Sequence, residues 1–170
     1  MQTTLKLQSL PFSSARTYLA AAAFIVGNIV LPQLFHMIPQ GGVTWLPIYF
    51  FTLVGAYMFG WRVGLITAIA SPLVNSLLFG MPLMGALPAI MLKSSVLAIV
   101  AGYAASRWHK ATLGTLIAVV LSYQVLGTLG EWAIKGDFFL ACQDFRIGIP
   151  GMLLQILGGW AVINLLIRKK

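Results

Sequence analysis

Acidic residues are scarce in this chain, and charged residues of either sign are few. The 170 residues include 3 Asp and Glu and 11 Lys and Arg, which together make 8% of the sequence, whereas hydrophobic residues make 59%. The mean hydropathy is +0.92. A chain of this length and composition cannot bury its apolar surface in one small water-soluble core. The sequence therefore predicts an all-α integral membrane protein, with residues 1–170 forming a single domain.

Cysteine is nearly absent as well. Cys142 is the one cysteine, so an intramolecular disulfide and a cysteine-rich metal site are both excluded. The excess of basic residues would suggest nucleic-acid binding in a soluble domain, but such binding requires a basic face. Here the basic residues lie at the ends of apolar segments. We therefore interpret the net charge of +8 as a determinant of membrane topology, and we expect no nucleic-acid partner.

Six apolar segments approach the roughly 20 residues that a helix needs to cross a bilayer. The second is short and is flanked by Pro47 and Gly60, and Pro72 interrupts the third. Proline removes one backbone hydrogen bond and is expected to kink that helix unless neighbouring groups compensate. The sequence thus predicts six transmembrane helices, at about residues 17–35, 44–60, 61–79, 87–107, 111–130 and 149–167.

The basic residues predict the orientation of these helices. Eight of them fall on one side if both termini lie there together with the loops that contain Arg62, Arg107 and Lys110. The opposite side then holds Lys135 and Arg146. By the positive-inside rule, the N- and C-termini are cytoplasmic. The outer side has loops at about 36–43, 80–86 and 131–148, and the last of these contains all three acids, Glu131, Asp137 and Asp144.

No set of catalytic residues is apparent. His36 and His109 fall on opposite sides in this topology, no His-Glu-x-x-His motif occurs, and Cys142 has no histidine near it in sequence. The segment Gly60-Trp-Arg-Val-Gly64 lacks the Lys-Ser/Thr that a phosphate-binding loop requires. We therefore expect no enzymatic activity, no catalytic residue, no metal and no cofactor. If ATP hydrolysis drives this protein, another subunit supplies that energy.

Lys93 is the most informative residue of the chain, because it lies within the apolar run of residues 88–103. A lysine at the centre of a spanning helix costs roughly 2.5–3.5 kcal/mol, so such a residue usually faces a cavity, a partner charge or a ligand. The first interpretation is that Lys93 neutralises an anionic group of a ligand, most simply a carboxylate. The alternative is structural, with Lys93 snorkelling outward or paired with an acid.

Other polar residues fall at a similar depth. At ~1.5 Å per helical residue, Asn75, Lys93, Gln124 and Gln155 all lie in the outer half of their helices. Gln124, Thr128 and Glu131 also share one helix face, at i, i+4 and i+7. Trp45 and Trp132 belong to the interfacial aromatic belt or close the site from outside. The predicted substrate-binding residues are therefore Lys93, Asn75, Gln124, Gln155, Trp45, Trp132 and Glu131.

The chain resembles a substrate-binding S component of the energy-coupling factor (ECF) transporters, the bacterial vitamin-uptake systems. The resemblance covers nearly the whole length and is carried mainly by residues 46–55, 59–64 and 71–80. It implies a multi-pass protein of the bacterial inner (cytoplasmic) membrane. It also implies an S-component-like bundle with an outward-facing pocket, formed mainly by helices four to six and covered by the first, third and fifth loops. The ligand is then a vitamin or a related small metabolite.

The resemblance also implies partners: a transmembrane coupling subunit and two ATPase subunits. In the family, an Ala-x-x-x-Ala pattern on the first helix docks against the coupling subunit. The pattern is imperfect here, because the nearest pair is Ala23 with Gly27. We expect docking through Ala20, Ala23 and Gly27, since small side chains let helices approach closely; packing within the bundle is the alternative. An alternative function is a structural membrane protein of a cell-envelope complex, similar to the rod-shape morphogenesis protein.

Overall fold

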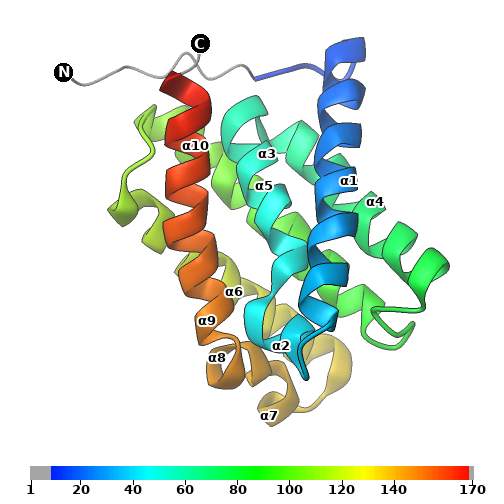
Figure 1. Cartoon of the computed structure of the whole chain (residues 1–170). Helices are drawn as coiled ribbons and strands as arrows, with labels where there is room; N and C mark the ends of the chain where they lie inside the picture. Colours follow the sequence, from blue (N-terminus) through cyan, green and yellow to red (C-terminus); the bar gives the residue numbers. More distant parts are fainter. Residues whose placement is uncertain (1–8, 169–170) are drawn as a thin grey trace.

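A computed structural model describes residues 9–168, and within that range all regular structure is helical. Lys6, Lys169 and Lys170, which we counted for the orientation, lie outside the described residues. Figure 1 shows the helices as a bundle. Its elements are α1 (Ala15–His36), α2 (Gly41–Trp45), η1 (Pro47–Tyr49), α3 (Phe50–Phe59), α4 (Trp61–Phe79), α5 (Leu87–Trp108), α6 (Leu113–Lys135), α7 (Phe138–Ala141), α8 (Gln143–Ile147), α9 (Ile149–Leu153), η2 (Leu154–Gly158) and α10 (Gly159–Arg168).

Among the described residues, five helices are long and apolar enough to cross a membrane. They are α1, α4, α5, α6 and the continuous run Ile149–Ile167, which joins α9, η2 and α10. These confirm the predicted membrane protein and five of its segments. The second predicted segment is helical but shorter, Pro47–Phe59. The structure therefore shows five candidate spans by length and composition, and the count of six stays a prediction. Pro72 lies inside α4, which runs as one helix from Trp61 to Phe79.

The short helix α3 forms the centre of the bundle. Leu53, Val54, Ala56 and Tyr57 are fully buried, and α3 contacts α1, α4, α5 and α10. Small residues permit this close packing, because a Cβ added at Gly64 of α4 would lie 2.4 Å from the Cβ of Ala56. The other helices therefore shield α3, so it needs no lipid-facing surface of its own.

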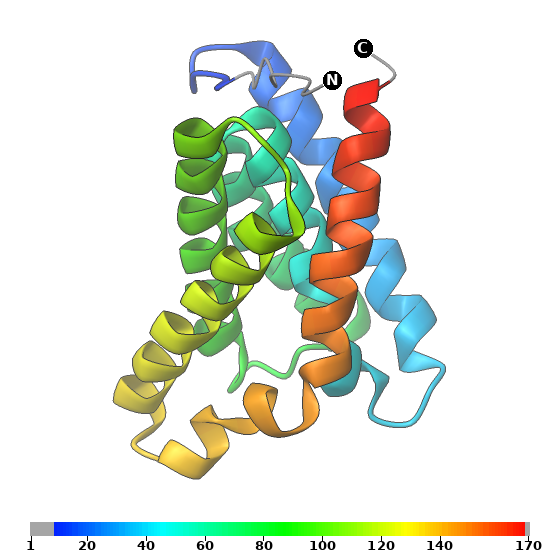
Figure 2. The same cartoon turned by 90° about the vertical axis from the view of Figure 1, so that its left-hand side faces the viewer.

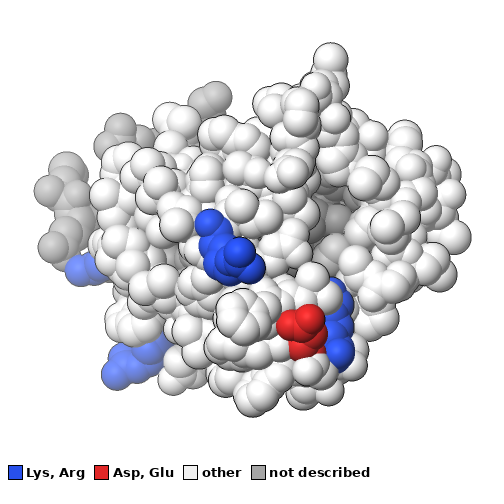
Figure 3. All heavy atoms as spheres, turned by 90° about the horizontal axis from the view of Figure 1, so that it is seen from below, with Lys and Arg blue, Asp and Glu red and all other residues white. Residues whose placement is uncertain are grey.

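The two ends of the bundle differ chemically. The N-terminal part of α1 and the C-terminal part of α10 lie at the same end, and α2, α7 and α8 lie at the opposite end (Figures 1 and 2). Arg62 and Arg107 belong to the first end, because α4 begins there and α5 finishes there. All three acids belong to the α6–α8 region of the second end. Seen from that end, the surface is mostly uncharged, with a few basic groups and a small acidic patch (Figure 3).

This arrangement makes the predicted orientation testable with two matched arginines. Arg146 and Arg107 are both exposed and lie at opposite ends of the bundle. In a Cys142→Ser background, Arg146→Cys should react with a membrane-impermeant maleimide in intact cells, and Arg107→Cys should react only after the membrane is opened. Each variant loses one basic charge, so each is a matched control for the other. Labelling of position 107 but not of position 146 in intact cells would show that the orientation is the reverse of the predicted one.

Candidate functional site

A network of four charged side chains lies at the end of the bundle that carries α8. The Nζ of Lys93 on α5 lies 2.5 Å from Oε2 of Glu131 on α6 and 2.8 Å from Oδ2 of Asp144 on α8. Lys135, one helical turn after Glu131, places its Nζ 2.6 Å from Oε1 of that residue. Gly127 makes room for the lysine, since a Cβ there would lie 2.6 Å from Cγ of Lys93.

The network is electrically balanced, with two ammonium groups and two carboxylates. Lys93 is 2% exposed and Glu131 is 7% exposed, so water contributes little to their charge compensation. Burial raises the pKa of the Asp144 carboxyl above its ordinary value, while the charge of Lys93 and its hydrogen bond act in the opposite direction. The Lys93 ammonium therefore has two internal counter-charges, which is the structural alternative that the sequence left open.

Beside this network lie buried polar atoms that have no partner in the described part of the chain. They include both amide atoms of Gln124, the hydroxyl of Thr128 and Nε2 of Gln155. Tyr123 donates a hydrogen bond of 2.8 Å to Oε1 of Gln155. An unsatisfied buried polar group costs about 1–3 kcal/mol. We call this region the polar cluster, made up of Lys93, Tyr123, Gln124, Thr128, Glu131, Asp144 and Gln155.

The sixth apolar segment is irregular at the polar cluster. Gln155 lies in η2, a π-helical turn that spans Leu154–Gly158 between α9 and α10. Such turns are rare and frequently occur at functional sites. Gly158 and Gly159 bring this turn against α3, because added Cβ atoms would lie 3.1 Å from Phe50 and 3.2 Å from Leu53. The wide turn and the close approach together fix the depth at which Gln155 enters the bundle.

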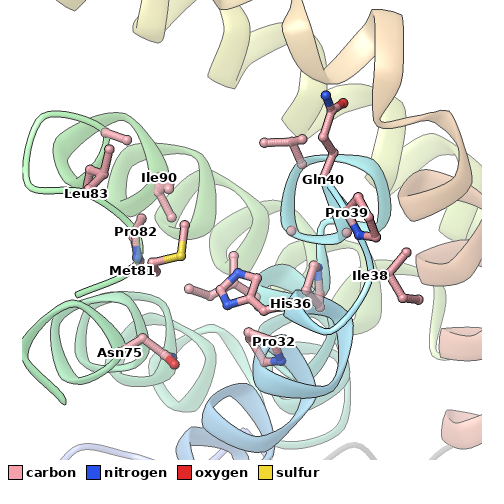
Figure 4. Close-up of a pocket in the computed structure, with 16 residues that line it drawn as sticks. Pro32, His36, Ile38, Pro39, Gln40, Asn75, Met81, Pro82, Leu83 and Ile90 are labelled. Atoms are coloured by element: carbon pink, nitrogen blue, oxygen red, sulfur yellow. The ribbon is translucent and has the colours of Figure 1, made fainter. Parts of the chain in front are cut away.

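An apolar cavity of about 440 Å³ lies at the same end of the bundle. The end of α1, the following turn, α2, η1 and the α4–α5 connection line it, and its labelled lining includes His36, Asn75, Met81 and Ile90 (Figure 4). This volume is in the range of small-molecule sites, which are mostly apolar with a few polar groups. Ile90, in the lining of the cavity, precedes Lys93 by about one turn of α5, so the two sites are close along that helix, but no residue of the polar cluster lines the cavity.

The structure assembles most of the predicted polar site. Lys93 and Glu131 are in contact, and Gln124 lies with Glu131 on the buried face of α6. Gln155 reaches the same face through Tyr123. Asn75 lies elsewhere: its amide donates to the carbonyl oxygens of Asn28 and Ser71, each at 2.9 Å, and it lines the apolar cavity.

The two predicted tryptophans are not part of the polar cluster. Trp45 packs on Phe35 of α1, with ring centroids 5.4 Å apart. Trp132 packs edge-to-face on Phe138 at 5.5 Å and is 46% exposed. Each ring packs on an aromatic neighbour, and a role of the two tryptophans in closing the site stays a prediction.

The sequence interpretation missed three members of this region. Asp144 contacts Lys93, Tyr123 orders Gln155, and Tyr49 of η1 packs its ring 5.7 Å from the ring of Tyr123. Asp144 carried a usable signal, because one buried lysine in a chain with three acids needs a counter-charge from among them. Tyr123 carried a weaker signal, its position next to Gln124 in the sequence, and Tyr49, between Ile48 and Phe50, carried none.

The predicted docking residues do not share one environment. Ala23 is exposed on α1 and Ala20 is half-buried. Gly27 instead faces the bundle, since a Cβ there would lie 2.7 Å from the ring of Phe51. Gly27 therefore serves packing between α1 and α3.

Comparison with known proteins gives no relative: no family model, no curated protein and no solved structure matches this chain. Among the described residues, no group of three or more His, Cys, Asp and Glu side chains is placed to hold a metal ion. The site is therefore interpreted from its own geometry.

The charge network predicts a large difference between its two lysines. Lys93→Met leaves Asp144 without an ammonium partner and Glu131 with Lys135 alone. Removing one partner of a buried pair costs about 3–5 kcal/mol. The side chain of Lys135 is 22% exposed, so Lys135→Met should cost about 1 kcal/mol or less. Thermal unfolding in mild detergent should show a much lower midpoint for Lys93→Met than for Lys135→Met. Equal midpoints would mean that the carboxylates do not hold Lys93.

Proposed function

We propose that this chain is the membrane-embedded substrate-binding subunit of an ECF-type ABC transporter, which captures a vitamin or related small metabolite from outside for ATP-driven uptake. The observation that carries the proposal is the set of unpartnered buried atoms on Gln124, Thr128 and Gln155. In a bilayer, water is scarce and an unsatisfied polar group is expensive. A ligand with hydrogen-bond donors and acceptors supplies the missing partners.

The charge network constrains the ligand. A simple carboxylate has to displace Glu131 or Asp144 from Lys93, because the ammonium already contacts both. A neutral or zwitterionic ligand leaves the balance of the network unchanged, so it fits better than the simple anion expected from Lys93 alone. The neighbouring apolar cavity of about 440 Å³ offers space for a ring or an alkyl portion of the same ligand.

Coupling to ATP hydrolysis has to come from other subunits, and α1 offers a surface for them. Leu19, Ala23, Val26 and Val30 are exposed and recur at the spacing of one helix face. Ala23 is the small residue on this face, where a partner helix can approach closely. The proposed docking face is therefore centred on Ala23, with Ala20 at its edge, and faces a transmembrane coupling subunit that works with two ATPases.

A structural role in a cell-envelope complex is the second candidate. A scaffold needs a rigid bundle and no ligand, and one internal network has this character. Asn28 of α1 donates to Thr52 of α3 at 3.0 Å and to Ser71 of α4 at 3.4 Å, and accepts from the backbone N–H of Phe51. Such satisfied polar groups fix helix packing. Their contrast with the unpartnered amides distinguishes the two candidates.

The binding proposal predicts opposite behaviour for two kinds of buried polar residue. Gln124→Met and Thr128→Val remove groups without partners, so the unfolding midpoint should stay level or rise. The expected gain in the free energy of unfolding is up to about 1–3 kcal/mol for each group. Asn28→Leu, the matched control, should lower it. A panel of water-soluble vitamins and their precursors, added to the purified wild-type protein, should contain a compound that raises the midpoint. The Gln124 and Thr128 variants should lose that shift.

A stabilising shift that persists in both variants would move binding away from the polar cluster. No shift with any compound of the panel, together with lower stability of Gln124→Met, would favour the structural role. A separate uptake experiment tests the transporter assignment. Uptake of the stabilising compound should require the coupling subunit and the ATPases. Undiminished uptake in cells that lack every coupling module would contradict the assignment.

A further inference from the structure

A second cavity lies away from the polar cluster, at the end of the bundle that carries Arg62 and Arg107, which we call the basic end. Its volume is about 680 Å³, and it lies between the start of α4 and the end of α5. The two helices meet at its base, where a Cβ added at Gly102 would lie 2.5 Å from the backbone nitrogen of Trp61. Polar and aromatic groups line it, including Trp61, Arg62, Tyr103, Ser106 and His109.

Arg62 is the charged residue among the described lining of this cavity, and two aromatic rings hold it in place. Its guanidinium carbon lies 4.9 Å from the ring centroid of Trp61 and 5.6 Å from that of Phe12. Stacking on rings orients a guanidinium but leaves its positive charge uncompensated. The rings therefore position Arg62 without neutralising it.

No acidic side chain of this protein is available to Arg62. The three acids of the sequence, Glu131, Asp137 and Asp144, all belong to the opposite end of the bundle. His109 lines the same cavity, and Arg107 and Lys110 flank it in the sequence. A concave site with basic side chains and no acidic side chain is suited to an anion from outside the chain.

The surroundings favour a lipid as the source of that anion. Trp61 and Tyr103, at the mouth, are 36% and 66% exposed, and these residue types prefer the headgroup level of a bilayer. Ile99, one turn before Tyr103 on α5, also lines the cavity and is 52% exposed. The site thus continues from a basic cavity onto an apolar helix face, as the headgroup and the acyl chain of a phospholipid require.

We propose that this cavity binds the phosphate of an anionic phospholipid, with the Arg62 guanidinium as its charge partner. Basic pockets between transmembrane helices bind anionic headgroups in this way. The acyl chain then follows Ile99 along α5. This inference does not depend on the proposed transport function, because it concerns the opposite end of the molecule.

The test compares phosphatidylglycerol with phosphatidylcholine on the purified full-length protein in detergent, with retained lipid measured by native mass spectrometry. Wild type should retain phosphatidylglycerol preferentially, and Arg62→Gln should reduce this preference by about fivefold, the effect of one basic group near an anionic surface. Arg16→Gln is the matched control, because Arg16 is exposed at the same end and does not line the cavity. It should retain the preference.

Ser106→Trp provides a second variant if Arg62→Gln does not fold. Ser106 is exposed and lines the cavity, so a bulky side chain there should block the lipid while Arg62 remains. Equal loss in Arg16→Gln and Arg62→Gln would show a diffuse charge effect and overturn the site. Displacement of the lipid by millimolar inorganic phosphate would assign the site to free phosphate, and the absence of any preference in wild type would refute lipid binding altogether.

Discussion

The rest of this structure depends on the need of one buried ammonium for counter-charges inside an apolar bundle. Lys93 obtains them from Glu131 on the neighbouring helix and from Asp144 on α8. The first contact requires α5 and α6 to approach closely, which Gly127 permits. The second draws the segment after α6 back against the end of the bundle. A single charge therefore sets the spacing of two helices and the position of the loop that covers them.

Two kinds of buried polar group coexist in the same bundle. The amide of Asn28 is fully engaged with α3 and α4, and it ties three helices together. Gln124 is equally buried and has no partner in the described residues. Groups of the first kind stabilise the fold, whereas groups of the second kind weaken it unless something binds them. Only the second kind carries the proposed function.

Much of the helical fold could be predicted from the sequence, because the length of an apolar segment is a local property. The rotation of each helix about its own axis could not be predicted. Membrane helices are apolar on every side, so composition does not distinguish the face of α1 that carries Gly27, which packs on Phe51, from the face that carries Ala23, which is exposed. Depth also groups Asn75 with the polar cluster, whereas its amide donates to the carbonyl oxygens of Asn28 and Ser71. Depth does not fix which neighbouring helix a side chain faces, and a role of Asn75 in ligand binding stays a prediction. The pairing of Lys93 with Asp144, 51 residues later, depends on how the last loop folds.

The central claim is that the polar cluster holds a small molecule, and native mass spectrometry of the gently purified protein tests it most directly. The claim predicts a fraction of the wild-type protein with the added mass of a non-lipid metabolite, which collisional activation releases, and no such fraction for a Gln124→Met, Thr128→Val double variant. The same bound metabolite in the variant, or only the bare chain and lipid adducts in the wild type after purification from metabolite-replete cells, would contradict it.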